Sequence, residues 1–137
     1  MIAFLSGENS FGQSLAYKAL LKRTYDQNFD LVYPKQKEFI KNAIILDTRE
    51  AYEFEVSHLK GAQWIGYETF NLSSVEDIPK DSPIVVYCSI GARSQEIGKI
   101  LKQNGFSKVY NLYGGIFHWV NENNPVFQAD TLPTNKV

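Results

Sequence analysis

The stretch that decides the fold is Ile84-Val85-Val86-Tyr87-Cys88-Ser89-Ile90-Gly91-Ala92-Arg93-Ser94. Its first four residues are apolar and rich in β-branched side chains, which predicts a strand buried on both faces. A helix is predicted from about Ala92 to Asn104, with Ile97, Ile100, Leu101 and Asn104 on one face. A buried strand followed closely by a helix is the building unit of a parallel α/β sheet, so this stretch favours that class of fold.

The same alternation continues on both sides of this stretch. Apolar runs predict further strands at residues 43–46, 61–65 and 109–112, and helices are expected at 34–40, from Arg49 onward, and at 116–123. Asp47 and Thr48 are the expected caps of the helix that starts near Arg49. Gly105 is expected to end the helix before it in a left-handed conformation, with Phe106 folding back. The pattern predicts an α/β domain with a mainly parallel central sheet flanked by helices on both faces.

Three segments are predicted along the 137 residues. Residues 34–127 form the α/β domain, residues 128–137 a C-terminal tail, and residues 1–33 an N-terminal helical extension. The extension is expected to contain a helix from about Ser14 to Tyr25 that packs on the domain through Leu15, Ala19 and Leu20. No function is assigned to it.

Composition limits the classes of function. The net charge is −1 and the basic residues are scattered, so neither nucleic acid nor an anionic membrane is an expected partner. No stretch approaches the roughly 20 apolar residues that span a bilayer. Residues 1–5 lack the basic flank of a signal peptide, and we expect a cytoplasmic protein. One cysteine allows no internal disulfide, and with His58 and His118 it forms no familiar zinc-binding set, so no metal is expected.

The junction between strand and helix has the composition of an anion site. Ligands of parallel α/β sheets bind beyond the carboxyl ends of strands, where backbone N–H groups and a helix N-terminus carry partial positive charge. A cysteine at such a place is expected to ionise readily, because helix N-termini and a nearby arginine stabilise a thiolate. We expect Cys88 to be the nucleophile, Arg93 to hold an oxyanion and Ser94 to donate its hydroxyl to the sulfur.

Four separate segments, in this order and spacing, resemble the rhodanese family of sulfurtransferases in its single-domain form. The resemblance covers about residues 34–127. The matching segments are Leu46-Asp47-Thr48-Arg49, His58-Leu59-Lys60-Gly61-Ala62, Cys88 to Ser94, and Tyr113-Gly114-Gly115 with Trp119. Two positions depart from the family pattern: Ser57 stands where glycine is frequent and Lys60 where proline is common.

The resemblance implies covalent sulfur transfer without a cofactor. The Cys88 thiolate would take the outer sulfur of thiosulfate or another small anionic donor and release sulfite or another leaving group. The resulting persulfide would pass its sulfur to a thiol or protein acceptor. The residues that would hold the donor and the persulfide are Ser89, Ile90, Gly91, Ala92, Arg93 and Ser94. Asp47 and Arg49 would support the fold and the loop.

Three alternatives stay open. Cysteine phosphatases and arsenate reductases also use a cysteine loop closed by arginine, but their signature places five residues between the two, whereas four intervene here. A non-catalytic interaction module is disfavoured, because such domains usually lack the cysteine that Cys88 supplies. A sulfur carrier dedicated to one protein acceptor has the same loop. Without a second cysteine in this sequence, an external acceptor must discharge the persulfide.

Overall fold

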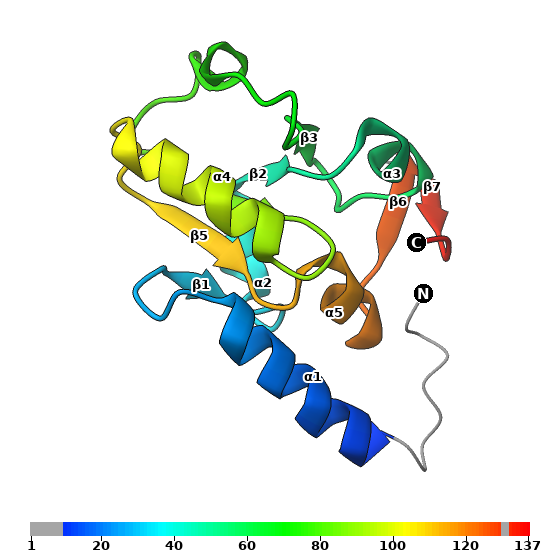
Figure 1. The fold of residues 1–137 in the computed structure, drawn as a ribbon. Coiled ribbons are helices and arrows are strands. Elements are labelled where there is room, and N and C mark those ends of the chain that lie inside the picture. The colour runs from blue at the N-terminus through cyan, green and yellow to red at the C-terminus, as the bar shows by residue number, and fades with distance from the viewer. Residues whose placement is uncertain (1–9, 130–131) are drawn as a thin grey trace.

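A parallel five-stranded sheet forms the centre of the computed structural model, which describes residues 10–129 and 132–137 (Figure 1). The strand order is β1-β5-β4-β2-β3, and every neighbouring pair is parallel. The strands are β1 (Leu31–Val32), β2 (Ile44–Asp47), β3 (Gln63–Trp64), β4 (Ile84–Tyr87) and β5 (Val109–Leu112). The predicted strands at 43–46, 61–65, 84–87 and 109–112 are therefore confirmed, with end shifts of one or two residues.

Helices cover both faces of this sheet. Along β4, Val85 and Tyr87 point to one face, where they pack with residues of α2 (Lys37–Asn42), α3 (Ala51–Val56) and α5 (Gly115–Asn121). Ile84 and Val86 point to the other face, where they pack with α4 (Ala92–Gln103) and with Val75 of the short 3₁₀ helix η2 (Leu72–Val75). The predicted α/β architecture, with helices on both faces of a parallel sheet, is confirmed.

The C-terminus of α4 is built as the sequence predicts. Gly105 has a φ of 97°, in the left-handed region. The Phe106 N–H donates to the Leu101 carbonyl at 3.2 Å, and the Gly105 N–H donates to the Lys102 carbonyl, also at 3.2 Å. This pair of bonds is the Schellman motif, and it returns the Phe106 ring to Leu101 in the core.

Several local predictions are wrong. The second helix begins at Lys37 rather than Pro34. The third begins at Ala51, within two residues of the predicted start near Arg49, but its N-cap is Glu50 and not Asp47 or Thr48. The Asp47 carboxylate instead accepts hydrogen bonds from the Arg49 backbone N–H and guanidinium.

The buried face of α4 also differs from its prediction. Ile97 and Leu101 are buried, but Ile100 and Asn104 are exposed. The other buried residues of α4 are Ser94, Gln95 and Gly98. At Gly98 the absence of a side chain leaves room for the Phe29 ring, with which a Cβ at this position would clash.

The N-terminal extension is more closely joined to the domain than the sequence indicated. Its helix is confirmed as α1 (Ser10–Thr24), but the predicted packing face is wrong: Leu15 is 54% exposed and Leu20 43%, while Leu21 is buried. The chain then adds β1 to the edge of the central sheet beside β5. No strand was predicted there, because two residues are too short for a recognisable alternation.

A hairpin lies where the sequence predicted a tail. Strands β6 (Val126–Ala129) and β7 (Leu132–Thr134) pair antiparallel, so the predicted start of the tail at residue 128 falls inside β6. Phe127 and His58 exchange backbone hydrogen bonds of 2.9 Å in both directions, which fastens β6 beside α3. The expectation that residues 1–5 are no signal peptide lies outside the described residues, as do tail residues 130 and 131.

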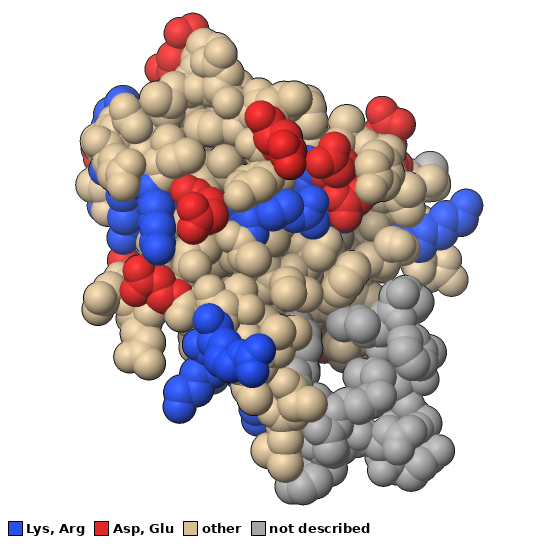
Figure 2. All heavy atoms as spheres, viewed as in Figure 1, with Lys and Arg blue, Asp and Glu red and all other residues tan. Residues whose placement is uncertain are grey.

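The surface carries charges of both signs. In Figure 2, acidic and basic side chains lie in small groups on a face that is mostly uncharged, and one group of basic side chains gathers over α1. Along the described parts of the chain, no helix has the length and apolar character needed to cross a membrane.

Candidate active site

Cys88 directly follows the carboxyl end of β4, which is the middle strand of the five-stranded sheet. The loop that follows ends at Gly91, the N-cap of α4, whose φ of 110° favours glycine. The cysteine is only 1% exposed. A reagent that reaches its sulfur must therefore be small or present a narrow end.

Backbone N–H groups surround the sulfur. The Gly91 N–H donates to Cys88 Sγ at 3.1 Å and the Ser94 N–H at 3.5 Å. The positive end of the α4 dipole lies at the same place. The predicted cradle thus brings Cys88, Gly91 and Ser94 together, and its donors suit a sulfur anion.

The Ser94 hydroxyl has a nearer partner than the sulfur. Its Oγ lies 3.5 Å from Cys88 Sγ but donates to Asn111 Oδ1 at 2.6 Å. The Asn111 amide in turn donates to the Gly91 carbonyl at 3.0 Å. The distances therefore favour Asn111 over the sulfur as the acceptor of the hydroxyl proton. Asn111, buried on β5, is a loop support that the sequence analysis missed.

Arg93 lies at the outer side of the loop and is paired. Its Nη1 lies 3.0 Å from Glu53 Oε1 on α3, and its Nη2 donates to Ser89 Oγ at 2.9 Å. Partial burial raises the pKa of Glu53, but the hydrogen bonds from Arg93 and from the Glu50 N–H, together with the charge of Arg93, outweigh it, and the net shift is downward. Partial burial lowers the pKa of Arg93, and Glu53 together with Cys88 reverses this to a net rise. Both groups are charged at neutral pH.

Sequence reasoning missed Glu53. It lies 40 residues before Arg93, and nothing in the spacing of the chain links the two. Its carboxylate also accepts a hydrogen bond from the Glu50 N–H at 2.8 Å, so its orientation is set by the first turn of α3.

Asp47 and Arg49 form a second pair, which is buried. Arg49 Nη2 lies 2.6 Å from Asp47 Oδ2 and also donates to the Ser57 carbonyl at 2.6 Å. Burial lowers the pKa of Arg49, but Asp47 more than offsets this, so the net shift is upward. Thr48, between them, bonds the Tyr87 carbonyl through its N–H at 3.0 Å, immediately before Cys88. The pair therefore lies next to the strand end from which the loop starts.

The two glycines at 114 and 115 let α5 approach the loop closely. Both have positive φ, and a Cβ on Gly115 would clash with the Ser89 carbonyl. The first N–H groups of α5 instead bond the loop: Ile116 to the Cys88 carbonyl at 2.9 Å and Phe117 to the Ser89 carbonyl at 3.2 Å. The turn thus holds the backbone of the cysteine as well as shaping the fold.

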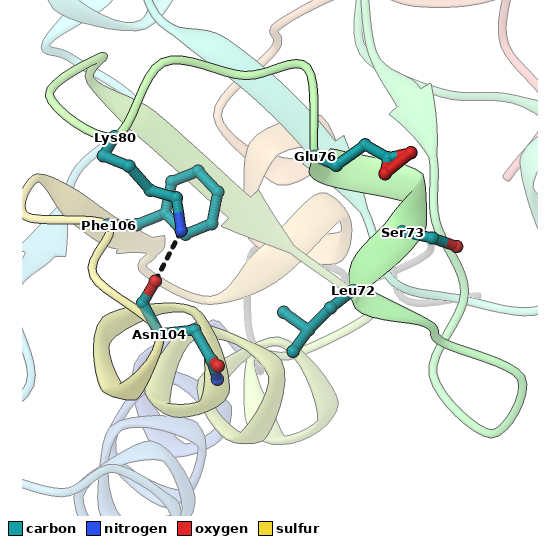
Figure 3. Close-up of a pocket in the computed structure, with 6 residues that line it drawn as sticks. All are labelled: Leu72, Ser73, Glu76, Lys80, Asn104 and Phe106. Atoms are coloured by element: carbon teal, nitrogen blue, oxygen red, sulfur yellow. Dashed lines mark hydrogen bonds between the residues drawn. The ribbon is translucent and has the colours of Figure 1, made fainter.

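Two of the cavities differ in their position relative to this loop. One, of about 250 Å³, opens beside the loop and is lined by Arg49, Tyr52, Glu53, Val56, Phe117 and Val137. The other, of about 300 Å³, lies at the far end of α4, where Lys80 Nζ donates to the Asn104 carbonyl at 2.6 Å (Figure 3). The described residues hold no group of three or more histidine, cysteine, aspartate or glutamate side chains suited to a metal ion.

These features define a class: an α/β domain with a buried cysteine at the carboxyl end of a central strand, two backbone N–H groups donating to its sulfur, and an arginine on the same loop. Comparison with known families agrees with this class. The model of the rhodanese-like domain matches residues 34–122, and the chain belongs to that family.

Curated relatives include tRNA uridine(34) hydroxylases. That of Salmonella arizonae is 37% identical over 87 residues, and that of Cronobacter sakazakii 34% over 83. Each match covers 57% of this chain but only 24% of the relative, so the chain spans about a quarter of their length.

Solved structures share the fold. A Bacillus halodurans protein has a TM-score of 0.65 at 24% identity, covering 88% of both chains. A rhodanese-related protein from Thermoplasma volcanium has a TM-score of 0.60 at 24% identity, covering 73% of this chain and 99% of its own.

Proposed function

We propose that this protein is a sulfurtransferase in which Cys88 carries sulfur as a persulfide. The observation that carries the proposal is the pair of backbone donors to Cys88 Sγ, the Gly91 N–H at 3.1 Å and the Ser94 N–H at 3.5 Å. Such donors stabilise a thiolate before the reaction and a terminal sulfur anion after it. Membership of the rhodanese-like family is consistent with this chemistry.

The reaction has two displacement steps. The Cys88 thiolate attacks the outer sulfur of thiosulfate, the new S–S bond forms, and sulfite leaves with the electron pair of the bond that breaks. A thiolate acceptor then attacks the terminal sulfur of the persulfide, and the Cys88 thiolate is the leaving group. Both steps conserve charge and electrons without a cofactor.

Arg93 is the group we assign to the donor anion. Its guanidinium lies at the side of the loop, and its planar fork suits the oxygens of a sulfonate. In the absence of a donor it pairs with Glu53 at 3.0 Å. An incoming anion therefore competes with Glu53 for Arg93, which limits the affinity for a small dianion.

The acceptor comes from outside this sequence. Its single cysteine leaves no second thiol to resolve the persulfide. A thiol-rich compartment supplies such acceptors, so we place the reaction in the cytoplasm. The hydroxylation named for the curated relatives is a property of proteins about four times the span matched here, and we do not extend it to this chain.

The test is the intact mass after incubation with thiosulfate, for the wild-type protein and Cys88→Ser. We expect a gain of one sulfur atom that a reducing thiol removes, absent from Cys88→Ser, and a complete loss of sulfur transfer to cyanide in that variant. Equal thermal unfolding of the two proteins is the control for folding.

Two results would overturn the proposal. One is retained turnover in Cys88→Ser. The other is the absence of any mass gain from both thiosulfate and a persulfide donor. If the second result is obtained, a phosphatase assay on the same samples tests whether the loop carries out phosphoryl transfer instead.

A further inference from the structure

The N-terminal segment, which lies outside the family match, reaches the cysteine loop through one side chain. Tyr25 follows α1, and its hydroxyl lies between two backbone groups. It donates to the Ile90 carbonyl at 2.6 Å and accepts from the Gly114 N–H at 2.7 Å. One hydroxyl group thus joins the N-terminal segment, the cysteine loop and the turn before α5.

The bond to Ile90 bears on the sulfur through the geometry of one peptide unit. The Ile90 carbonyl and the Gly91 N–H belong to the same trans peptide, so they point in opposite directions. The Gly91 N–H is the shorter of the two backbone hydrogen bonds to Cys88 Sγ. Holding the carbonyl outward therefore holds this N–H on the sulfur.

This peptide needs an external constraint. Gly91 has a φ of 110°, and glycine permits the rotations by which the peptide between residues 90 and 91 can turn over. In the reversed orientation the Ile90 oxygen would face the sulfur and repel a thiolate or persulfide. Tyr25 also occupies the space beside Gly91, since a Cβ at position 91 would clash with its ring and hydroxyl.

Tyr25 is itself held in place. The neighbouring Asp26 N–H donates to Gln95 Oε1 at 2.6 Å, and Gln95 Nε2 donates to the Thr24 carbonyl at 3.1 Å. Gln95 is buried on α4, next in sequence to Ser94. The tyrosine ring contacts Tyr113 edge to face, with centroids 5.8 Å apart. The hydroxyl is therefore anchored to the same helix whose N-terminus faces the sulfur.

We infer that Tyr25 is a positioning residue that locks the peptide between Ile90 and Gly91 with its N–H on Cys88 Sγ. By this inference the N-terminal segment contributes to the site, because it supplies Tyr25. The inference rests on the proposed role of Cys88 as a nucleophile, but its test does not require sulfur transfer.

The test compares Tyr25→Phe with Tyr33→Phe. The first substitution keeps the ring and removes the hydroxyl. The second removes a hydroxyl from the same aromatic cluster, since the Tyr33 ring lies 4.9 Å from that of Tyr113. The readout is the rate at which iodoacetamide alkylates Cys88, followed by intact mass as a function of pH.

For Tyr25→Phe we expect alkylation at neutral pH to be about tenfold slower, the effect of weakening one hydrogen bond to an anion. The pH profile should move to higher pH by a corresponding amount, whereas Tyr33→Phe should match the wild type. A Tyr25→Phe profile that superimposes on the wild-type profile would overturn the inference.

Two further measurements keep the result unambiguous. If no persulfide forms but the Tyr25→Phe profile still moves, the lock stands and the proposed function fails. If Tyr25→Phe does not fold, amide hydrogen exchange of the wild-type protein decides. Slow exchange at both Gly91 and Gly114 supports the lock, and exchange at either as fast as in an open loop overturns it.

Discussion

The two acid–arginine pairs near the cysteine share their chemistry but differ in burial. Asp47 and Arg49 have side chains that are 0% and 3% exposed, and their closest atoms are 2.6 Å apart. Glu53 and Arg93 have side chains that are 23% and 28% exposed, at 3.0 Å. The first pair lies between β2 and α3, behind the loop. The second lies at the side of the loop, and the cavity beside the loop is lined by one member of each pair, Arg49 and Glu53.

The difference teaches which pair supports the structure and which can take part in binding. Separating a fully buried pair leaves a charge without water or a partner, so Asp47 and Arg49 stay together. A partly exposed pair gains little and can exchange partners with an incoming ion at small cost. Arg93 can therefore serve the donor, whereas Arg49 cannot leave Asp47.

Removing one member of the buried pair should have the largest effect. We expect Asp47→Ala to lower the free energy of unfolding by about 3–5 kcal/mol, because the Arg49 charge is left uncompensated. Glu53→Ala, the matched change in the exposed pair, should cost less than about 1 kcal/mol. Urea unfolding of both variants measures the two losses, and equal losses would contradict the comparison.

Removing the arginine of the exposed pair should act on the donor rather than on the fold. We expect Arg93→Ala to raise the KM for thiosulfate about tenfold, the effect of losing a hydrogen bond to a charged group. The KM of Arg93→Lys, which keeps the charge but not the planar fork, should lie between the values of the wild type and Arg93→Ala. Steady-state sulfur transfer to cyanide measures this, and an unchanged KM in Arg93→Ala would place Arg93 outside the donor site.

Neutralising the competing carboxylate should have a smaller effect of opposite sign. We expect Glu53→Gln to lower the KM for thiosulfate by roughly two- to fivefold, the range typical of a partly exposed ion pair. The reason is that the donor no longer competes with the Glu53 carboxylate for Arg93. The substitution also removes a negative charge that repels the incoming anion. The same assay as for Arg93 applies, and a higher KM in Glu53→Gln would mean that Glu53 helps to bind the donor.

The smallest effect concerns the pH dependence of stability. The pKa of Glu53 in the folded protein is lower than its ordinary value of 4.5. Its ionised form therefore stabilises the fold above that pH, and the contribution is lost as the pH falls through the lower folded value. We expect the difference in unfolding free energy between the wild type and Glu53→Gln to vanish in acid. A difference that grows on acidification would contradict the direction of the shift.

Much of the fold was predictable because it rests on local patterns. The apolar run of β4, the start of α4 and the turn at Gly105 each follow from residues within one or two turns of chain. The cysteine loop was predictable for the same reason, since Cys88 and its two N–H donors lie within seven consecutive residues.

Other parts of the site depend on contacts between distant residues. Glu53 is 40 positions from Arg93, and Tyr25 is 65 positions from Ile90. The face of α1 was predicted wrongly because Leu15, Leu20 and Leu21 are equally apolar, and only the position of the neighbouring strands decides which one is buried. The two-residue strand β1 exists because β5 offers an unpaired edge.

The sequence by itself determined the class of fold and the place of the cysteine loop, because strand alternation, helix ends and a glycine-containing loop act over a few residues. Only the tertiary structure decided which groups surround that cysteine. Ion pairing, burial and the direction of a single peptide depend on the segments that packing brings together, and the order of residues along the chain does not specify those segments.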